Sequence, residues 1–304
     1  MIPSYNADRH LSEAIRSVLA QDPGFDVMQI EVVDDGSAID PTPLVRRLSD
    51  GRVTVHRHSV NRGHVATFNT CIERARGELV HLLHADDAVR PGFYERLGAA
   101  LDAHPDAGAA FCRYIAIDSD GNWTGIAALE EPRAGILAGW HERIATGQRL
   151  QPPCIVVRRR VYDDIGSFDG RISSYGEDWE MWTRIAASYP VWYDPEPLAL
   201  YRVGDDSLSA AALRTGDNVR QLLLVIDINR ERLPLETRAE ISTRARRDTA
   251  RSAIRRSVRL ARSGDGRGAL AQLLWSVRAD ASPSTLTHVA AGAFRVCWAQ
   301  LSRR

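Results

Sequence analysis

Two neighbouring carboxylates, Asp86 and Asp87, follow a short apolar run at residues 79–83. Carboxylate oxygens are the ligands that divalent cations such as Mn2+ and Mg2+ prefer, and a bound cation could neutralise a diphosphate. The same residues could instead form a solvated turn, in which an aspartate caps a helix that starts near Pro91. The pattern by itself leaves both interpretations open.

A second acidic pair, Asp34 and Asp35, precedes Gly36 and Ser37 at the end of another apolar run. Asp and Gly favour a turn after a strand, which is the better interpretation of this cluster taken alone. A carboxylate here could also accept hydrogen bonds from the edge of a nucleotide base. Tyr5, just past the first apolar run, could stack on such a base, although a tyrosine in this position is more often simply half-buried.

A third acidic pair, Glu177 and Asp178, begins an aromatic-rich segment at residues 177–182. Carboxylates in the first turn of a helix are favoured by the helix dipole, and from the residues alone we prefer this explanation. A carboxylate at the mouth of a pocket lined by tryptophan can also have a raised pKa and act as a general base.

The histidine pairs His56/His58 and His81/His84 have spacings found in metal sites. No third ligand lies near either pair in the sequence, so the pattern does not favour a zinc site.

Strands and helices alternate through the first half of the chain, in units of roughly thirty residues. Apolar periodicity predicts helices at 11–19, 43–48, 66–76 and 91–104, and strands at 30–33, 53–56, 79–83 and 109–117. This alternation indicates an α/β fold with a mostly parallel central sheet flanked by helices. Ligands of such sheets bind at the carboxyl ends of the strands, so the polar clusters at residues 4–6, 34–37 and 86–87 are expected to meet at one edge.

The pattern is weaker in the second half. Residues 123–151 are expected to form a mobile loop with one short helix near Trp140, and short strands are expected at 155–157, 191–193 and 198–201. Helices are predicted at 160–165 and 178–188, and from residue 215 the signal is helical, with breaks at Pro234, 264–268 and 282–283.

Composition narrows the class of protein. The chain has 304 residues, of which 44% are hydrophobic and 26% charged, as in an ordinary globular protein. All 39 basic residues are arginine, which excludes a lysine Schiff base or a P-loop lysine. From Arg230 onward 16 arginines face 6 acidic residues, so a basic tail follows an acidic body. Four dispersed cysteines, no secretory signal and no long apolar run favour a cytoplasmic protein.

The polar clusters occur in a fixed order. They are Pro3-Ser4-Tyr5-Asn6, Asp34-Asp35-Gly36-Ser37, Asn61-Arg62-Gly63 with Asn69, His84-Ala85-Asp86-Asp87, Gly166-Ser167-Phe168-Asp169, a run from Gly176 to Arg184, and Tyr201-Arg202. In this order and spacing the chain resembles glycosyltransferase family 2, the inverting nucleotide-sugar glycosyltransferases with the GT-A fold. The resemblance covers residues 1–209 or so.

The resemblance implies a role for each cluster. A nucleotide-binding role is implied for Pro3, Tyr5, Asp34, Asp35, Asn61, Gly63 and Asp86, with Tyr5 packed on the base and Asp86 near the ribose. Asp87 matches the ligand of a divalent metal, Mn2+ or Mg2+, that bridges to the diphosphate. Asp178 matches the general base of inverting members, and Glu177, Trp179 and Trp182 fall on the acceptor side.

Three positions depart from the family pattern. Met1 lies inside the expected first strand, so either this strand is short or the start is late. His84 replaces a frequent leading aspartate of the metal motif, a change to which we give little weight. Gly204 stands where a histidine often follows Tyr201-Arg202, so a third metal ligand is missing or is supplied by Asp205 or Asp206.

We therefore expect a GT-A domain at residues 1–212 and a basic helical extension at 213–304. The expected activity is metal-dependent, inverting transfer of a sugar from a nucleoside-diphosphate donor, with UDP favoured, to a hydroxyl of a glycan, a lipid-linked sugar or a small molecule. A bacterial cell-envelope polysaccharide or glycoconjugate pathway fits this class. The basic helices are interpreted as solvated faces or as a peripheral contact with the inner face of a membrane, and no nucleic-acid partner is expected.

Other classes fit less well. A non-catalytic nucleotide-sugar or carbohydrate-binding protein with a degenerate first strand is the alternative, and the retained acidic pairs argue against it. A sugar-nucleotide pyrophosphorylase or a dinucleotide-dependent oxidoreductase would need a glycine-rich loop after the first strand, which residues 4–8 lack.

Overall fold

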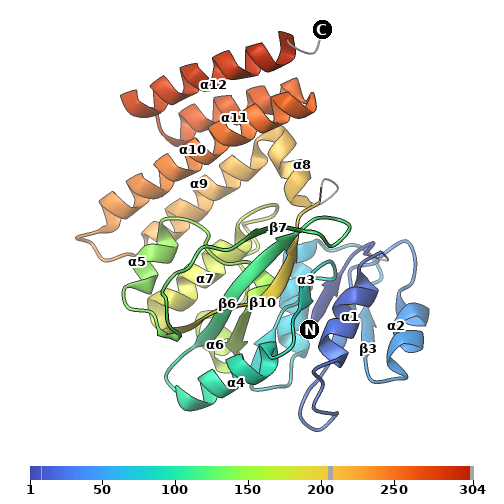
Figure 1. Cartoon of the computed structure of the whole chain (residues 1–304). Helices are drawn as coiled ribbons and strands as arrows, with labels where there is room; N and C mark the ends of the chain where they lie inside the picture. The colour runs from blue at the N-terminus through green and yellow to red at the C-terminus, as the bar shows by residue number, and fades with distance from the viewer. Residues whose placement is uncertain (8, 205–207, 302–304) are drawn as a thin grey trace. The chain divides into compact units, whose positions relative to one another are not determined.

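The computed structural model describes residues 1–7, 9–204 and 208–301 (Figure 1). They divide into two compact units. The first unit comprises Met1–Trp140, Arg149–Gly170 and Ser188–Val203, and the second comprises His141–Gln148, Arg171–Ala187 and the described residues of Gly204–Arg304. The expected domain boundary between residues 212 and 213 stays a prediction.

The first unit contains every strand of the described chain. The strands are β1 (Ile2–Ser4), β2 (Glu31–Asp34), β3 (Thr54–Arg57), β4 (Leu79–His81), β5 (Ala88–Val89), β6 (Ala109–Ile117), β7 (Trp123–Ile126), β8 (Gly135–Ile136), β9 (Ile155–Arg158) and β10 (Val191–Arg202). Its helices are α1 (Leu11–Leu19), α2 (Thr42–Ser49), α3 (His64–Arg74), α4 (Phe93–Ala103), the short 3-10 helix η1 (Pro152–Cys154) and α6 (Arg159–Ile165).

The carboxyl ends of the first four strands share one edge of the sheet. β1 pairs in parallel with β2, and β2 with β3. The Met1 amino group donates to His81 O, and Leu83 N donates to Met1 O, which is the bonding pattern of a parallel pair and joins β1 to β4. β1, β2 and β3 form a three-stranded sheet and β4 belongs to a seven-stranded one, and these two bonds place β4 alongside β1. The polar clusters following β1, β2 and β4 therefore lie along the same edge, as expected.

The second half of the sheet is mixed rather than parallel. β9 lies between β4 and β6 and is antiparallel to both, whereas β6 and β10 are parallel and run side by side in Figure 1. The two strands predicted at 191–193 and 198–201 form the single strand β10, because irregular register between Asp194 and Ala199 carries the chain through two prolines without ending the pairing. The α/β class is confirmed, and the parallel order holds for the first half.

Helix positions in the first unit follow from local apolar spacing. α1 buries Leu11, Ile15 and Val18 on one face. α3 buries Val65, Phe68 and neighbouring residues. Each fully buried aliphatic side chain contributes about 1.5–3 kcal/mol relative to exposure, so these stripes are sufficient to fix the helices against the sheet.

The second unit is helical. Besides α5 (Trp140–Ala145) and α7 (Glu177–Ser188), most of whose residues belong to it, it contains α8 (Leu208–Thr215), α9 (Asp217–Arg230), α10 (Arg238–Ser263), α11 (Gly266–Ala279) and α12 (Pro283–Leu301). Figure 1 shows α9 to α12 packed as neighbouring rods. Alanines on the inner face of α10, such as Ala245, Ala250 and Ala253, are fully buried and let these helices approach closely. Among the helices described, none is long and apolar enough to cross a membrane.

Candidate functional site

The loops that follow β1 and β2 are bonded to each other. Asp35 N donates to Ser4 O over 2.8 Å, and Asn6 N donates to Ser37 Oγ over 2.8 Å. Asn6 has a left-handed φ of 49°, a conformation that asparagine tolerates better than most residues. Between these anchors Tyr5 is 49% exposed, so part of its ring is open to a ligand, whereas Pro3 is buried within β1.

Asp34 is used by the protein itself. It is completely buried, and its oxygens accept hydrogen bonds from Ser37 N and from the Ser37 hydroxyl. The Arg57 guanidinium lies 3.2 Å from Asp34 Oδ2 and completes its surroundings. Asp34 therefore fixes the turn after β2, and a nucleotide-binding role for it stays a prediction.

Asp35 holds the start of α3. Its Oδ1 accepts a hydrogen bond from Arg62 N at 2.8 Å and pairs with His58 Nδ1 at 2.9 Å, while Oδ2 accepts from Gly63 N at 2.9 Å. Asn61 Oδ1 also accepts from Gly63 N, at 3.0 Å. A carboxylate has about four lone-pair positions, so Asp35 retains one for a further donor. The structure thus brings the predicted residues Asp35, Asn61 and Gly63 together.

Gly36 permits this arrangement. Its φ is +71°, and a Cβ placed on it would come within 2.8 Å of Val60 C and 2.9 Å of Asn61 N. No side chain fits there without moving the backbone, so the loop after β2 and the loop before α3 can touch only through glycine.

The loop after β4 gathers three groups that can ligate a metal. His84, Asp86 and Asp87 each offer one ligand atom, and these atoms all lie within 4.8 Å of one another. Asp87 is buried, and its Oδ1 accepts a hydrogen bond from Arg202 N at 2.8 Å. Its Oδ2 is also buried and accepts no hydrogen bond from any described residue. Burial, and secondarily the charge of Asp86, raises the pKa of the Asp87 carboxyl well above its usual range.

Arg202 at the end of β10 holds this loop in place. Its Nε donates to Asp86 O over 2.8 Å, Nη1 donates to Asp118 O over 2.9 Å, and Nη2 donates to the Glu13 carboxylate. Because the guanidinium contacts the Asp86 backbone and not its carboxylate, the half-buried Asp86 side chain remains available to a ligand. Asp205 and Asp206 were predicted as alternatives for a third metal ligand. Both lie outside the described residues.

His84 is the third possible ligand in this group, although its place in the sequence was given little weight. Its ring stacks on Phe68, with centroids 5.0 Å apart, and its Nδ1 lies 4.0 Å from Asp87 Oδ2. His81, the other member of its pair, points elsewhere: it is buried and bonded to Tyr94 Oη and Pro153 O. Burial lowers the pKa of His81 to about 3, so it stays neutral. The signal for His84 was its place at the head of the metal motif.

Asp178 lies in the second unit, in the first turn of α7. It is buried, its Oδ1 accepts a hydrogen bond from Trp179 N at 2.7 Å, and its Oδ2 accepts one from the Gln148 amide. Burial, and secondarily the charge of Glu177, raises the pKa of the Asp178 carboxyl well above its usual range. A carboxylate in this state accepts a proton readily, as a general base requires. Gln148 carries no recognisable sequence signal.

The loop that leads into α7 is fixed by α9. Ser174 Oγ donates to the Asp217 carboxylate, and Ser173 N donates to Gln221 Oε1 at 3.3 Å. Gly176 has a φ of +91°, and a Cβ there would lie 3.2 Å from the Leu222 side chain. α9 therefore positions the segment that carries Asp178, and both belong to the second unit.

The predicted acceptor-side residues on α7 are buried with one exception. Trp179 is 1% exposed and its Nε1 donates to Ile144 O at 2.7 Å, and Trp182 is 2% exposed. Both are interior side chains, whereas Glu177 is half-buried. A role for the tryptophans as a wall of the acceptor pocket stays a prediction.

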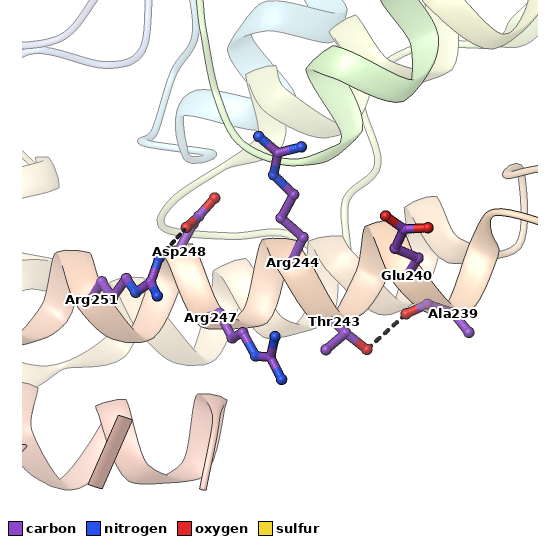
Figure 2. A pocket seen from close by; sticks show the side chains of 7 residues that line it. All are labelled: Ala239, Glu240, Thr243, Arg244, Arg247, Asp248 and Arg251. Carbon is purple, nitrogen blue, oxygen red and sulfur yellow. Dashed lines mark hydrogen bonds and ion pairs between the residues drawn. The ribbon is translucent and has the colours of Figure 1, made fainter. Parts of the chain in front are cut away.

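Two pockets lie away from these side chains. One, of about 570 Å3, runs along the exposed face of α10, and Figure 2 shows Arg244, Arg247 and Arg251 beside Glu240 and Asp248 there. The other, of about 460 Å3, lies in the first unit and is lined largely by apolar residues of its strands and helices, such as Ile2, Ile30, Leu79, Val80 and Val156.

Comparison with known proteins agrees with the motif order. The family model described as glycosyl transferase family 2 matches residues 1–166. The succinoglycan biosynthesis protein ExoO of Rhizobium meliloti is 39% identical over 120 residues, which are 39% of this chain and 32% of ExoO.

Two solved structures resemble the whole described fold. TarS residues 1–349 of S. aureus, in complex with UDP-GlcNAc, gives a TM-score of 0.61 at 15% identity and covers 91% of this chain and 90% of that one. The mannosyltransferase PcManGT of Pyrobaculum calidifontis, in complex with GDP-Man and Mn2+, gives 0.57 at 20% identity, covering 96% and 78%. At these identities the likeness shows the fold, which is the predicted GT-A type. With the family model matching more than half of its length, the chain belongs to glycosyl transferase family 2.

Proposed function

We propose that this glycosyltransferase moves a sugar from a nucleoside-diphosphate donor, by preference a UDP-sugar, to a hydroxyl group of an acceptor, with inversion at the anomeric carbon. The observation that carries the proposal is the group formed by His84, Asp86 and Asp87, with one buried Asp87 oxygen that no described residue bonds. Buried polar atoms without partners are rare in proteins, and this one is explained if a ligand bonds it.

The nucleotide would bind along the edge formed by the loops after β1 and β2. The half-exposed Tyr5 ring offers a surface on which a base can stack, and the remaining lone pair of Asp35 can accept a base N–H. The UDP-GlcNAc complex of the similar TarS fold supports UDP, and the GDP-Man complex of PcManGT makes guanine the alternative.

The residues after β4 fit a divalent metal. Two carboxylates and one imidazole are a donor set that suits Mn2+, and carboxylate oxygens suit Mg2+ equally. His84, Asp86 and Asp87 would hold the ion, and a bound cation supplies positive charge beside the departing nucleoside diphosphate. Arg202, at the end of β10, keeps this loop in place by donating to the Asp86 backbone carbonyl and to the Asp87 carboxylate.

Asp178 would take the proton from the acceptor hydroxyl. Its hydrogen bonds from Trp179 N and Gln148 orient the carboxylate, while burial raises its affinity for a proton. Removal of the hydroxyl proton as the oxygen attacks makes a single displacement feasible, and a single displacement inverts the anomeric centre. The charge of Glu177, the preceding residue, raises the same pKa further.

The sharpest test of this function replaces the proposed base. A panel of nucleotide sugars is first screened for donor hydrolysis, and the donor that turns over is used for transfer. Asp178→Asn is expected to lower transfer about 10³-fold, because general-base catalysis contributes about 10²–10⁴-fold. Glu177→Gln is the matched control and should lower it far less.

Binding measurements separate catalysis from donor recognition. UDP affinity, measured by calorimetry with Mn2+, should be equal in Asp178→Asn and the unaltered protein. Transfer that survives the substitution would overturn the base assignment. Binding of UDP and Mn2+ without hydrolysis of any donor would favour the non-catalytic alternative.

For the acceptor we propose a component of a cell-envelope polysaccharide or glycoconjugate, which the likeness to ExoO supports. We also propose that the basic helices contact an anionic membrane surface. Arg244, Arg247 and Arg251 are exposed on one face of α10 (Figure 2), and each basic residue near such a surface contributes about 1 kcal/mol. Flotation with vesicles of phosphatidylcholine and phosphatidylserine should carry the protein, and vesicles of phosphatidylcholine alone should not. Equal flotation of a variant with all three arginines changed to glutamine would contradict this contact.

A further inference from the structure

Arg256, on the inner side of α10, has an unusual environment. Its Nη2 lies 3.4 Å from Tyr175 Oη, a long hydrogen bond, and its Cζ lies 5.9 Å from the centre of the Tyr175 ring. Its Nη1 is buried and has no hydrogen-bond acceptor among the described residues, and no described carboxylate forms an ion pair with the guanidinium. A permanently charged group is therefore partly buried against a phenol that satisfies it poorly.

Such an arrangement is costly unless a ligand completes it. Burial of a charge without an opposite charge or strong hydrogen bonds is unfavourable, and buried polar atoms are almost always bonded. The neighbouring arginines show the contrast: Arg246 pairs with Asp227 at 2.5 Å, and Arg255 donates to Ser252 Oγ in the solvent. Arg256 differs from both because one of its guanidinium nitrogens is buried and bonds no described residue.

The position of Arg256 connects it to the proposed base. Tyr175 precedes Gly176, Glu177 and Asp178, in the loop that α9 fixes. The pKa of Tyr175 is raised mainly by burial, is lowered by Arg256, and is raised by Asp178 and Glu177, so all these charges act on one phenol. The guanidinium therefore lies beside the segment that would receive the acceptor hydroxyl.

We propose that Arg256 binds an anionic oxygen group of the acceptor, a phosphate or a carboxylate, and that the natural acceptor of this enzyme is anionic. The inference rests on the proposed function, because it assigns the acceptor to the neighbourhood of Asp178. The planar guanidinium presents paired N–H donors that match phosphate and carboxylate oxygens, and bonds of this kind are about twice as strong as those between neutral groups. Arg256 is then a specificity-determining residue, and Tyr175 orients its side chain.

The first experiment measures anion binding without any turnover. Inorganic phosphate and, separately, acetate are titrated into the full chain at high ionic strength, where exposed arginines are screened. Binding of phosphate is followed by the 31P line width, and binding of acetate by its proton line width. Arg256→Gln is expected to weaken binding of the preferred anion about tenfold, because one charge-assisted hydrogen-bonded contact is lost. The matched control Arg255→Gln, one residue away and exposed, should change it less than about twofold.

Two further variants keep the test decisive if Arg256→Gln does not fold. Arg256→Lys keeps the charge but loses the paired N–H donors of the planar guanidinium. It should weaken anion binding about threefold or more. Tyr175→Phe removes the phenolic oxygen, leaves the cation, and should have a smaller effect than either. Equal anion binding by the unaltered protein and by every Arg256 variant that folds overturns the proposal.

The second experiment identifies the source of the anion. With the donor found by the hydrolysis screen, nucleotide release is compared for phosphate-bearing, carboxylate-bearing and neutral sugar acceptors. The acceptor KM of the anionic class should rise about tenfold in Arg256→Gln, whereas the KM of neutral sugars should stay the same. A preference for neutral acceptors in the unaltered protein, or loss of UDP binding in Arg256→Gln, would assign the arginine to another partner and refute the acceptor role.

The two proposals can fail separately. If anion binding depends on Arg256 but no nucleotide sugar is turned over, the proposed function is wrong. If transfer occurs with neutral acceptors and anion binding is indifferent to Arg256, the function stands and this inference is wrong.

Discussion

The acidic pair Asp34 and Asp35 and the acidic pair Asp86 and Asp87 look almost alike in the sequence, since each follows an apolar strand of the first unit. Their surroundings differ. Asp34 accepts bonds from Ser37 and lies against Arg57, and Asp35 accepts bonds from the backbone that starts α3. Asp87, in contrast, keeps a buried oxygen that no described residue bonds, and it forms a group of three possible metal ligands with His84 and Asp86.

The two pairs of aspartates therefore serve different purposes. The first pair spends almost all of its hydrogen-bonding capacity on the protein and so builds the loop that would frame the base. The second pair leaves capacity unused at the cost of a buried, poorly solvated carboxylate. Unused capacity of this kind is expected where a ligand binds, because structural carboxylates that bind nothing gain nothing from it.

The largest effect that this comparison predicts is on transfer when the unsatisfied oxygen is removed. Asp87→Ala should lower transfer about 10³-fold, since loss of metal-assisted charge stabilisation costs several kcal/mol. It should also abolish the dependence of UDP affinity on Mn2+, measured by calorimetry. Asp120→Ala is the control and should have no effect, because Asp120 is exposed and its carboxylate pairs with Arg9. A Mn2+ titration unchanged by Asp87→Ala would refute the metal role.

The next effect concerns the free energy of unfolding. It should appear only in the pair Asp34 and Asp35, whose oxygens are hydrogen-bonded by the protein. Asp34→Asn places an amide where Ser37 N and Arg57 need an acceptor, and this should lower the free energy of unfolding by about 3 kcal/mol. Urea denaturation followed by circular dichroism measures it. Asp40→Asn removes the charge of an exposed carboxylate that also pairs with Arg57, 3.5 Å away, and should cost less than about 0.5 kcal/mol. Similar losses in both variants would mean that Asp34 is not the structural member of the pair.

The sequence predicted what local patterns determine. Apolar spacing located α1, α3 and α4, and the order of the motifs indicated both the family and the fold. β5, with two residues, and β7 and β8 in the segment expected as a loop escaped prediction, because strands this short exist only through pairing with distant partners.

The different roles of the two acidic pairs could not be predicted from the sequence either. It depends on contacts between residues far apart in the chain. Arg202 reaches the Asp86 backbone across 116 positions and Glu13 across 189. Gln148 reaches Asp178 from 30 positions away. Spacing within a motif contains no information about such partners, so residues of the same type in the same local pattern acquire different roles.

A smaller effect, on Mn2+ affinity, tests whether His84 binds the metal together with Asp86 and Asp87. His84→Ala should weaken Mn2+ binding about tenfold, the usual result of losing one supporting group at a metal site. His84→Asp should instead preserve binding and shift the preference from Mn2+ towards Mg2+, because magnesium favours oxygen ligands over imidazole. Calorimetry with each ion measures both. A Mn2+ affinity that is the same in all three proteins would remove His84 from the site.

The third acidic pair, Glu177 and Asp178, sharpens the comparison because it combines features of the other two. Asp178 is hydrogen-bonded on both oxygens, and its pKa is raised, as that of Asp87 is. Hydrogen-bond satisfaction alone therefore does not decide whether a buried carboxylate is destabilising. Burial and a like charge on the next residue oppose its ionisation, and they act whether or not its oxygens are bonded.

This difference predicts a small gain in stability. Because the folded protein holds the Asp178 proton more tightly than the unfolded chain does, the stabilisation linked to this proton is present at acid pH and is lost as pH rises through the folded-state pKa. Asp178→Asn has no carboxyl group to ionise, and the Gln148 amide can turn so that its oxygen accepts from the new NH2 group. At neutral pH the variant should therefore be more stable than the unaltered protein by about 1 kcal/mol. The advantage should shrink as pH falls through that pKa. Thermal unfolding across this pH range, with Glu177→Gln giving a part of the same gain, measures the effect. An advantage that persists at acid pH would show that packing, and not the ionised carboxylate, limits stability here.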